Sequence, residues 1–273
     1  MSYPLLALDL DGTLTNGQKI ITPRTLSALQ AAQKRGTRLV LASGRPTRGI
    51  APLAEQLELA RYGGYVLSYN GGKIIEWSTK EVVHEQTLSL SLVRRLYAYA
   101  QREDLPLVTY SNTGIITDHP GNPYLDEEAR INQMPVERVP DFLAAVENLP
   151  FLPTKCLIAG DPERLVTLTE EMRQAFEGEM EVFRSAPFFI ELPPLGIDKA
   201  KSLQRLLEHL GLKAAQLMAC GDGYNDLSML RLAGFSVAMA NAEAEVKAVA
   251  HHITTSNEED GVGLAVERFI LAD

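Results

Sequence analysis

A short apolar run near the start of the chain ends directly in two acidic residues. Residues 5–8 are leucine and alanine only, which predicts a buried β-strand, and Asp9 and Asp11 follow it. Ligands of open α/β sheets bind outside the carboxyl ends of the strands, so both acids stand where chemistry takes place. Alternate residues of an extended segment share a face, so the two carboxylates can point into one site. Gly12 then lets the backbone turn sharply.

Predicted strands and helices alternate through residues 1–72 and again after residue 196. The apolar runs at 38–42 and 65–68 predict two more strands, each separated from the preceding strand by a helical pattern. Beyond residue 196 the order is helix, strand, helix, strand, helix, a short strand and a final helix. This rhythm predicts an α/β fold with a doubly wound parallel sheet.

The order of predicted helices and strands is different between these two parts of the chain. Residues 82–187 show grouped helices and short strands, which favours an α+β unit with an antiparallel sheet. We therefore predict an inserted domain over residues 82–187. The surrounding catalytic core then comprises residues 1–81 and 188–273.

Composition limits the classes of partner. The formal net charge of −9 disfavours a general binder of nucleic acid or anionic membranes, because no basic excess is available to neutralise phosphates. A small phosphorylated substrate needs only a local cluster of donors and a metal. No apolar stretch approaches the ~20 residues of a membrane span, and no signal-peptide pattern opens the chain. Cys156 and Cys220 are isolated, so we expect reduced thiols in a cytoplasmic protein.

Several chemically active side chains fall at one predicted edge of the sheet. Carboxylates that converge there would repel each other unless a cation lay between them, and oxygen ligands of this kind suit Mg²⁺. A lysine and a serine hydroxyl offer a positive charge and a donor to phosphate oxygens. The residues are Asp9 and Asp11 after the first strand, Ser43 after the second, Asp222, Asn225 and Asp226 after the fourth, and Lys199 at the start of the preceding helix.

Two further residues stand close to these strand ends. Asn70 ends the third predicted strand, which favours contact with substrate or phosphate. Arg45 follows Ser43 closely and could reach the substrate, although an ion pair or a helix cap is an equally good interpretation.

These residues and their order resemble the haloacid dehalogenase-like (HAD) phosphohydrolases. Residues 9–13 (DLDGT) match the first motif of that family, Ser43 the second, Lys199 the third, and residues 221–226 (GDGYND) the fourth. Residues 42–46 (ASGRP), residues 70–72 (NGG) and the inserted domain resemble the Cof subfamily, which carries the α/β cap called C2B.

The resemblance implies a mechanism and a set of roles. Asp9 is the nucleophile that forms an aspartyl-phosphate, and Asp11 is the general acid and base. The Mg²⁺ ligands that the resemblance implies are Asp9, the backbone carbonyl of Asp11, Asp222 and Asp226. The residues implied to bind phosphate and substrate are Ser43, Gly44, Arg45, Asn70, Lys199 and Asn225.

One position departs from the subfamily pattern. Ala200 follows the motif lysine where the subfamily commonly has glycine, so Lys201 is a competing candidate. We prefer Lys199 because it fits the register of the apolar positions that follow it.

The resulting prediction is a Mg²⁺-dependent phosphatase of small phosphorylated metabolites. Sugar phosphates rank first, ahead of nucleotide-type and cofactor phosphates, and the cap is expected to set specificity. We expect no nucleic-acid or membrane partner, and a monomer or a homodimer. The alternatives are a phosphomutase of the same superfamily and a non-catalytic phospho-acceptor of the response-regulator type, which would be shorter and lack a cap.

Overall fold

The chain forms two compact units in the computed structural model, which describes residues 3–272. The first unit comprises Met1–Gly44, Ile50–His84 and Asp198–Asp273. The second unit comprises Arg45–Gly49 and Glu85–Ile197. Each unit contains its own hydrophobic core.

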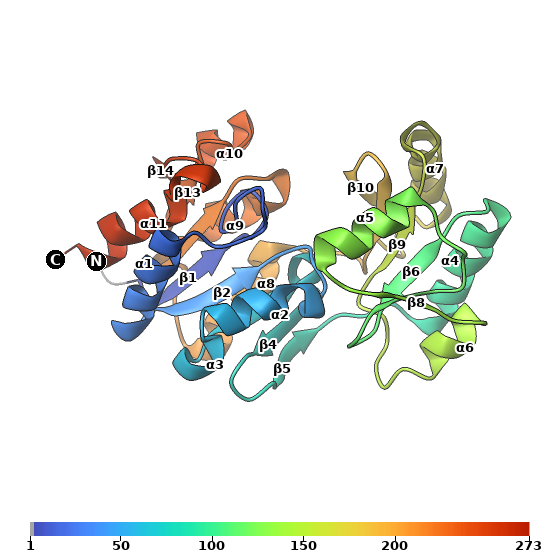
Figure 1. Cartoon of the computed structure of the whole chain (residues 1–273), viewed down its shortest axis with the longest axis horizontal. Coiled ribbons are helices and arrows are strands. Elements are labelled where there is room, and N and C mark those ends of the chain that lie inside the picture. The colour runs from blue at the N-terminus through green and yellow to red at the C-terminus, as the bar shows by residue number, and fades with distance from the viewer. Residues whose placement is uncertain (1–2, 273) are drawn as a thin grey trace. The chain divides into compact units, whose positions relative to one another are not determined.

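The first unit is built on an eight-stranded sheet (Figure 1) with the strand order β14-β13-β12-β1-β2-β3-β4-β5. The strands from β14 to β3 in this order run parallel, and β4 pairs antiparallel with β3. Strand β1 therefore lies in the interior of the sheet. The strands are β1 (Leu5–Leu8), β2 (Arg38–Ala42), β3 (Tyr65–Ser68), β4 (Lys73–Glu76), β5 (Val82–Glu85), β12 (Leu217–Gly221), β13 (Phe235–Ala238) and β14 (His252–Ile253).

Strand register brings the ends of three strands to one level. Leu8 at the end of β1 lies opposite Leu41 of β2 on one side and Cys220 of β12 on the other. The residues that follow these strands consequently emerge at the same edge. This edge carries the acidic and polar residues singled out in the sequence.

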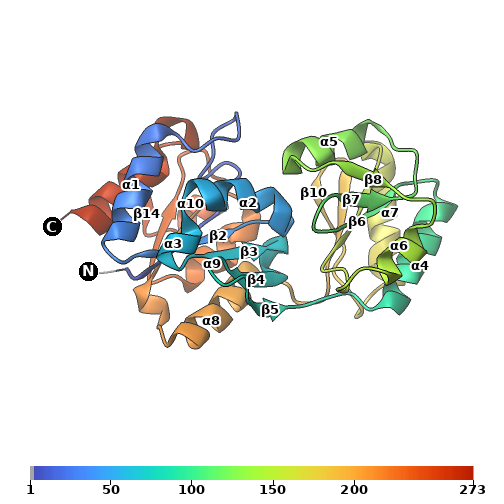
Figure 2. The same cartoon turned by 60° about the horizontal axis from the view of Figure 1, so that its bottom comes forward.

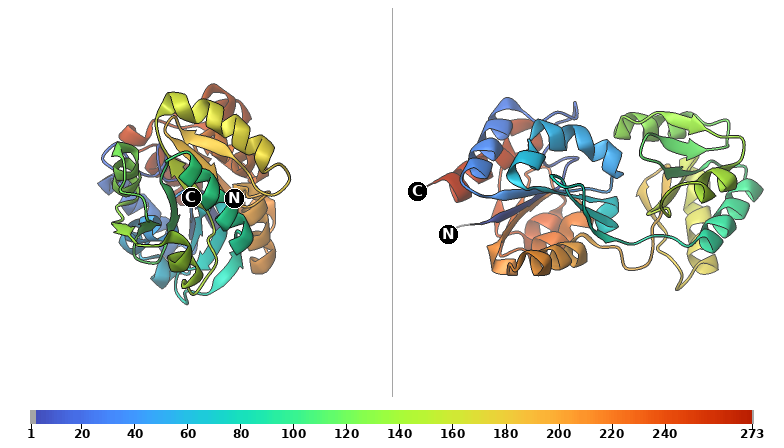
Figure 3. Two further views of the ribbon diagram at one scale, coloured as in Figure 1. Left: turned by 90° about the vertical axis from the view of Figure 1, so that its right-hand side faces the viewer. Right: turned by 90° about the horizontal axis from the view of Figure 1, so that it is seen from below.

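Helices cover both faces of this sheet. Figure 2 and the right-hand view of Figure 3 show α1 and α2 on one side and α8 on the other. Helix α8 turns Leu203, Leu206 and Leu207 toward the core, as expected for an amphipathic helix. The helices are α1 (Pro23–Lys34), α2 (Thr47–Gln56), α3 (Leu59–Tyr62), α8 (Lys199–Leu210), α9 (Leu227–Leu232), α10 (Ala244–Val249) and α11 (Gly261–Val266), with a terminal π-helical turn, Glu267–Leu271.

The second unit has a six-stranded sheet with the order β10-β11-β9-β6-β7-β8. Its pairs are antiparallel except for β7 with β8, which are parallel. The strands are β6 (Leu107–Tyr110), β7 (Ile115–Thr117), β8 (Val136–Arg138), β9 (Cys156–Ala159), β10 (Phe183–Ala186) and β11 (Phe189–Leu192), and the helices are α4 (Leu90–Arg102), α5 (Pro123–Asn132), α6 (Phe142–Glu147) and α7 (Pro162–Ala175).

The α/β fold class predicted from the sequence is confirmed, while both predicted limits of the inserted domain differ. Its long segment begins at Glu85 rather than at residue 82, because β5 belongs to the first sheet. The predicted return to the core at residue 188 falls in the β10–β11 hairpin, and β11 pairs with β9 of the second sheet. The second unit therefore extends to Ile197. A local strand pattern does not reveal which sheet a strand joins, because its hydrogen-bond partners are distant in sequence.

Both cysteines are buried and neither forms a disulfide. Burial raises the pKa of the Cys156 and Cys220 thiols to about 12. Among the helices of residues 3–272, none combines the length and apolar character needed to cross a membrane.

Candidate active site

Asp9 begins the site at the carboxyl end of β1. Its backbone N–H donates to the carbonyl of Cys220 at 3.0 Å, which continues the pairing with β12 by one residue. Its carbonyl accepts from the N–H of Leu14 at 3.2 Å, so the chain turns back immediately. Asp9 is buried, at 6% exposure of the whole residue.

Lys199 connects two carboxylates of the site. Its Nζ lies 2.7 Å from Oδ1 of Asp9 and 2.7 Å from Oδ1 of Asp226. Lys199 is 1% exposed and opens α8, whose first turn is capped by the Asp198 side chain. A buried ammonium with two carboxylate partners is fixed in position, so it also fixes the orientation of Asp9.

Asp226 is held through both of its carboxylate oxygens. Oδ1 accepts from Lys199, and Oδ2 accepts from the backbone N–H groups of Asp222 and Gly223, each at 3.0 Å. Asp226 is fully buried. With its oxygens engaged by donors, Asp226 fits the role of orienting Lys199 better than that of a direct metal ligand.

Asp222 packs against the turn that follows Asp9. The Thr13 hydroxyl donates to Oδ1 of Asp222 at 2.7 Å. Gly12 has φ +86°, and a Cβ added there would lie 2.3 Å from Oδ2 of Asp222. Glycine is therefore required here both by the backbone conformation and by the close approach of the carboxylate.

The carboxylates of Asp9, Asp222 and Asp226 each have an oxygen within 4.8 Å of the others. Burial raises the pKa of Asp9 well above its usual range, with Asp226 and Asp222 adding to the rise and Lys199 opposing it. Burial also raises the pKa of Asp222 to about 6. Burial favours a lower pKa for Lys199, but Asp226 and Asp9 together raise it above its ordinary value.

This donor set fits a divalent cation. The site gathers three carboxylates, of which Asp9 and Asp226 are buried and share the Lys199 ammonium, so negative charge is in excess. A bound cation would relieve the repulsion between these carboxylates. Carboxylate and carbonyl oxygens are the ligands that Mg²⁺ prefers. Asp9 and Asp222 are the carboxylates best placed to hold it, because Asp226 is already engaged by Lys199 and two backbone N–H groups.

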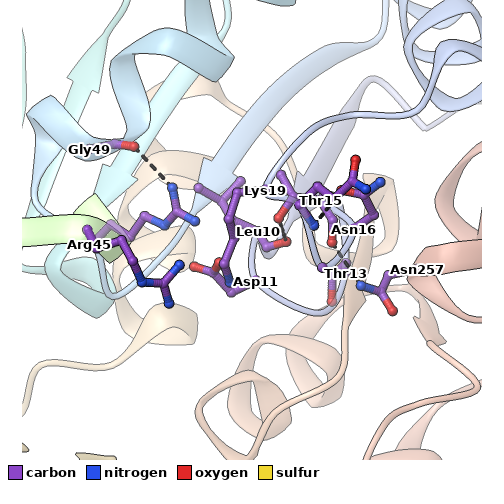
Figure 4. A network of polar contacts seen from close by, with 12 residues as sticks. Leu10, Asp11, Thr13, Thr15, Asn16, Lys19, Arg45, Gly49 and Asn257 are labelled. Atoms are coloured by element: carbon purple, nitrogen blue, oxygen red, sulfur yellow. Dashed lines mark hydrogen bonds and ion pairs between the residues drawn. The ribbon is translucent and has the colours of Figure 1, made fainter. Parts of the chain in front are cut away.

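Asp11 lies at the start of the loop that leaves β1 (Figure 4). Its Oδ1 forms an ion pair with Nζ of Lys19 at 2.6 Å. The side chains remain partly accessible, at 35% exposure for Asp11 and 29% for Lys19. Asp11 therefore differs from Asp9: it is open to solvent and paired with a different lysine.

Ser43, Gly44, Asn70 and Asn225 meet at the ends of β2, β3 and β12. The carbonyl of Ser43 accepts from the N–H of Asn70 at 2.9 Å. Asn70 has φ +56°, and its Oδ1 accepts from Nδ2 of Asn225 at 3.1 Å. A Cβ on Gly44 would lie 3.1 Å from Nδ2 of Asn70. The structure thus joins four of the residues predicted to bind phosphate and substrate.

Arg45 and Lys201 have other surroundings. Arg45 is buried and its Nη1 donates to the carbonyl of Gly49 at 3.3 Å (Figure 4). It belongs to the second unit, so its role toward a substrate stays a prediction. Lys201 is exposed on α8, and its backbone N–H donates to Oδ1 of Asp198. Of the two competing lysines, Lys199 is the one whose ammonium contacts Asp9.

Sequence reasoning did not single out three residues that support the site. Nδ2 of Asn241 donates to the carbonyl of Gly12 at 2.8 Å, and Nδ2 of Asn257 donates to the carbonyl of Thr15 at 2.9 Å. Lys19 is the third. No local sequence pattern predicts these contacts, because two of them join segments more than 200 residues apart.

Comparison with known proteins decides the family. The sequence model of the haloacid dehalogenase-like hydrolases matches residues 6–266. The chain belongs to this family. The resemblance inferred from the motifs is thereby confirmed.

Relatives of this HAD-like hydrolase cover nearly its whole length. A putative phosphatase, YxeH of Bacillus subtilis (strain 168), is 33% identical over 273 residues, covering 99% of each chain. A haloacid dehalogenase-like hydrolase from Bacteroides thetaiotaomicron is 46% identical, with a TM-score of 0.95 over 98% of this chain and 100% of that one. BT4131, described as a sugar phosphatase of HAD subclass IIB, is 26% identical, with a TM-score of 0.79 over 97% and 98%. These findings place the HAD-like chain among the phosphatases of its superfamily, as predicted.

Proposed function

We propose that this protein is a Mg²⁺-dependent phosphatase that hydrolyses small phosphorylated metabolites through an aspartyl-phosphate on Asp9. The observation that carries the proposal is the bridge from Lys199 to Asp9 and Asp226 beside Asp222. It combines a fixed carboxylate nucleophile, a buried positive charge for phosphoryl oxygens and an oxygen-rich site for a cation.

In the first step, an oxygen of the Asp9 carboxylate attacks phosphorus. The new bond joins Asp9 to the phosphoryl group, and the bond from phosphorus to the leaving oxygen breaks. Asp11 donates a proton to that oxygen. The Lys199 ammonium stabilises the negative charge of the phosphoryl group during transfer, and Ser43 supplies a hydroxyl donor at the neighbouring strand end.

In the second step, a water molecule attacks the phosphorus of the aspartyl-phosphate. Asp11, now ionised, accepts a proton from that water. The bond between phosphorus and the Asp9 oxygen breaks, which releases phosphate and regenerates the Asp9 carboxylate. The accessibility of Asp11 suits a residue that exchanges protons with both the leaving group and water.

Asp9, Asp222 and the backbone carbonyl of Asp11 are the groups that would hold Mg²⁺. When bound, the cation supplies positive charge that keeps Asp9 ionised and neutralises the phosphoryl oxygens. The raised pKa values of Asp9 and Asp222 are consistent with this assignment, since burial and, to a lesser degree, the neighbouring carboxylates disfavour their charged forms when no cation is present.

Sugar phosphates are the substrate class we propose first. The similarity to BT4131, a sugar phosphatase by its description, supports this choice. The screen that tests it measures phosphate released from sugar phosphates, nucleotides, pyridoxal phosphate and flavin mononucleotide, with Mg²⁺ and with a chelator. We expect Mg²⁺-dependent release, highest on sugar phosphates and abolished in Asp9→Asn.

Two results would contradict the proposal. If phosphate release continued at an unchanged rate in chelator, the proposed requirement for Mg²⁺ would be excluded. If Asp9→Asn turned over substrate at the wild-type rate, the assignment of Asp9 as the nucleophile would be excluded. Release without any bisphosphate activator separates a phosphatase from an enzyme that acts only as a phosphomutase.

A further inference from the structure

The loop between Asp11 and α1 folds back so that one of its side chains contacts Asp11. Nζ of Lys19 lies 2.6 Å from Oδ1 of Asp11, eight residues earlier in the chain. Figure 4 shows both residues on this loop. The lysine that holds Asp9 comes from α8, so the two acids of the first motif are paired with two different lysines.

A tight turn presents Lys19. The N–H of Lys19 donates to the carbonyl of Asn16 at 2.9 Å, and Oδ1 of Asn16 accepts from the N–H groups of Gln18 at 3.0 Å and Ile20 at 3.2 Å. Lys19 has φ +63°, in the left-handed region that residues with a Cβ adopt rarely. The asparagine side chain stabilises this turn locally.

Distant segments fix the same loop. Asn241 and Asn257 donate to the carbonyls of Gly12 and Thr15, and the N–H of Asn257 donates to Oδ1 of Asn241 at 3.1 Å. The N–H of Gly17 donates to a carboxylate oxygen of Glu258 at 2.6 Å. The loop is thereby tied to the segments after β13 and β14.

The ion pair itself adds little stability. Both partners are about one-third exposed, and exposed ion pairs contribute ~0–1 kcal/mol. A left-handed lysine costs ~1 kcal/mol or more. A strained residue maintained for a weak contact points to a role other than stability.

We propose that Lys19 is a positioning residue for Asp11. Its ammonium holds the Asp11 carboxyl group in the orientation from which it passes a proton to the leaving oxygen and later accepts one from water. This inference rests on the proposed function, because it assumes that Asp11 is the general acid and base.

Leaving groups of different basicity test the proposal. Lys19→Met is compared with the wild type on p-nitrophenyl phosphate, whose leaving group needs little protonation, and on the best alkyl phosphate from the metabolite screen. General acid catalysis contributes ~10²–10⁴-fold, so imperfect positioning is expected to lower kcat by ~10-fold on the alkyl phosphate and by less than ~3-fold on p-nitrophenyl phosphate. Lys19→Arg is expected to restore most of the loss.

A double-mutant cycle separates positioning from a general structural effect. Adding Lys19→Met to Asp11→Ala should cause no further loss on the alkyl phosphate, because the group that Lys19 positions is already absent. Lys34→Met, at an exposed lysine of α1, serves as the matched control and should keep the wild-type rate on both substrates.

The proposal is overturned if Lys19→Met loses the same factor on both substrates, or if its loss is fully retained in the Asp11→Ala background. The rate of the wild type with Mg²⁺ tests the proposed phosphatase function, whereas ratios among the variants test Lys19. The proposed phosphatase function and the proposed role of Lys19 can therefore be contradicted independently.

Discussion

Lys199 is the residue whose contacts order the candidate site. One buried ammonium lies 2.7 Å from both Asp9 and Asp226, and Asp226 in turn accepts from two backbone N–H groups. The orientation of Asp9 is therefore coupled to the loop after β12. Without Lys199, two buried carboxylates would lose their shared counter-charge.

Replacement of Lys199 should affect both stability and rate. For Lys199→Met without divalent metal, we expect the free energy of unfolding to fall by ~3 kcal/mol or more, since removing one partner of a buried ion pair costs ~3–5 kcal/mol. Phosphate release should fall by ~10²-fold or more. Urea unfolding and a phosphate assay measure the two effects.

Lys201 supplies the matched control on the same helix. It is exposed, so Lys201→Met should change stability by no more than ~0.5 kcal/mol and leave the rate near that of the wild type. Equal losses in both variants would contradict the distinction between the two lysines.

At the residue level, the sequence predicts those parts of the site that follow strand ends. Asp9, Asp222 and Asp226 could be named because each lies just beyond an apolar run, and Lys199 because of its register in an amphipathic helix. Lys19 could not be found in this way. Its approach to Asp11 depends on a left-handed turn that no apolar pattern indicates.

At the scale of elements, the turn after β1 is closely constrained. Gly12→Ala places a side chain at φ +86° and 2.3 Å from Oδ2 of Asp222. Such a conformation costs ~1–2 kcal/mol by itself, and the contact adds to it. We expect stability to fall by more than ~2 kcal/mol and the phosphatase rate to fall with it, as measured by thermal unfolding and phosphate release.

Gly36 separates the two causes of that loss. It also has a positive φ, +96°, but a Cβ there meets nothing within 4 Å. Gly36→Ala should therefore cost only the backbone strain of ~1–2 kcal/mol and leave the rate unchanged. A Gly12→Ala variant as active as Gly36→Ala would show that the approach of Asp222 to this turn is unimportant.

Strands in which an apolar run ends in polar residues were the easiest to predict. Strands β1, β2 and β12 were expected because an apolar run ends in polar residues at each of them. Strands β4 and β5 had no counterpart among the expected elements, and the predicted domain limit at residue 188 separated β11 from the rest of its sheet. In these cases pairing between strands decides the structure, and a single strand does not carry that information.

At the scale of the whole molecule, excess buried negative charge links metal binding to pH. Burial raises the pKa of Asp222 from 3.8 to about 6, and that of Asp9 also rises. Between pH 3.8 and about 6, Asp222 of the folded metal-free protein holds a proton that the unfolded chain has released. The stability that this gives is present at low pH and is lost as the pH rises through about 6.

Mg²⁺ should therefore stabilise the protein more at neutral than at acidic pH. At about pH 7.5 the ionised carboxylates bind the cation directly, whereas at about pH 5 bound protons must first leave. We expect a larger rise in Tm on adding Mg²⁺ at about pH 7.5 than at about pH 5, measured against chelator. Asp222→Asn should lose most of this rise, and an equal rise at both pH values would contradict the assignment of the cation to these carboxylates.

Covalent trapping is the most direct test of Asp9 as the nucleophile. Asp11→Ala, which is expected to hydrolyse the intermediate slowly, is mixed with Mg²⁺ and the best substrate, quenched in acid and analysed by peptide mass spectrometry. We predict one phosphoryl group on Asp9, and none on that peptide when Asp9→Asn is added. The assignment of Asp9 as the nucleophile would be contradicted by a phosphoryl group on a different residue. It would also be contradicted by turnover with no covalent intermediate in any variant.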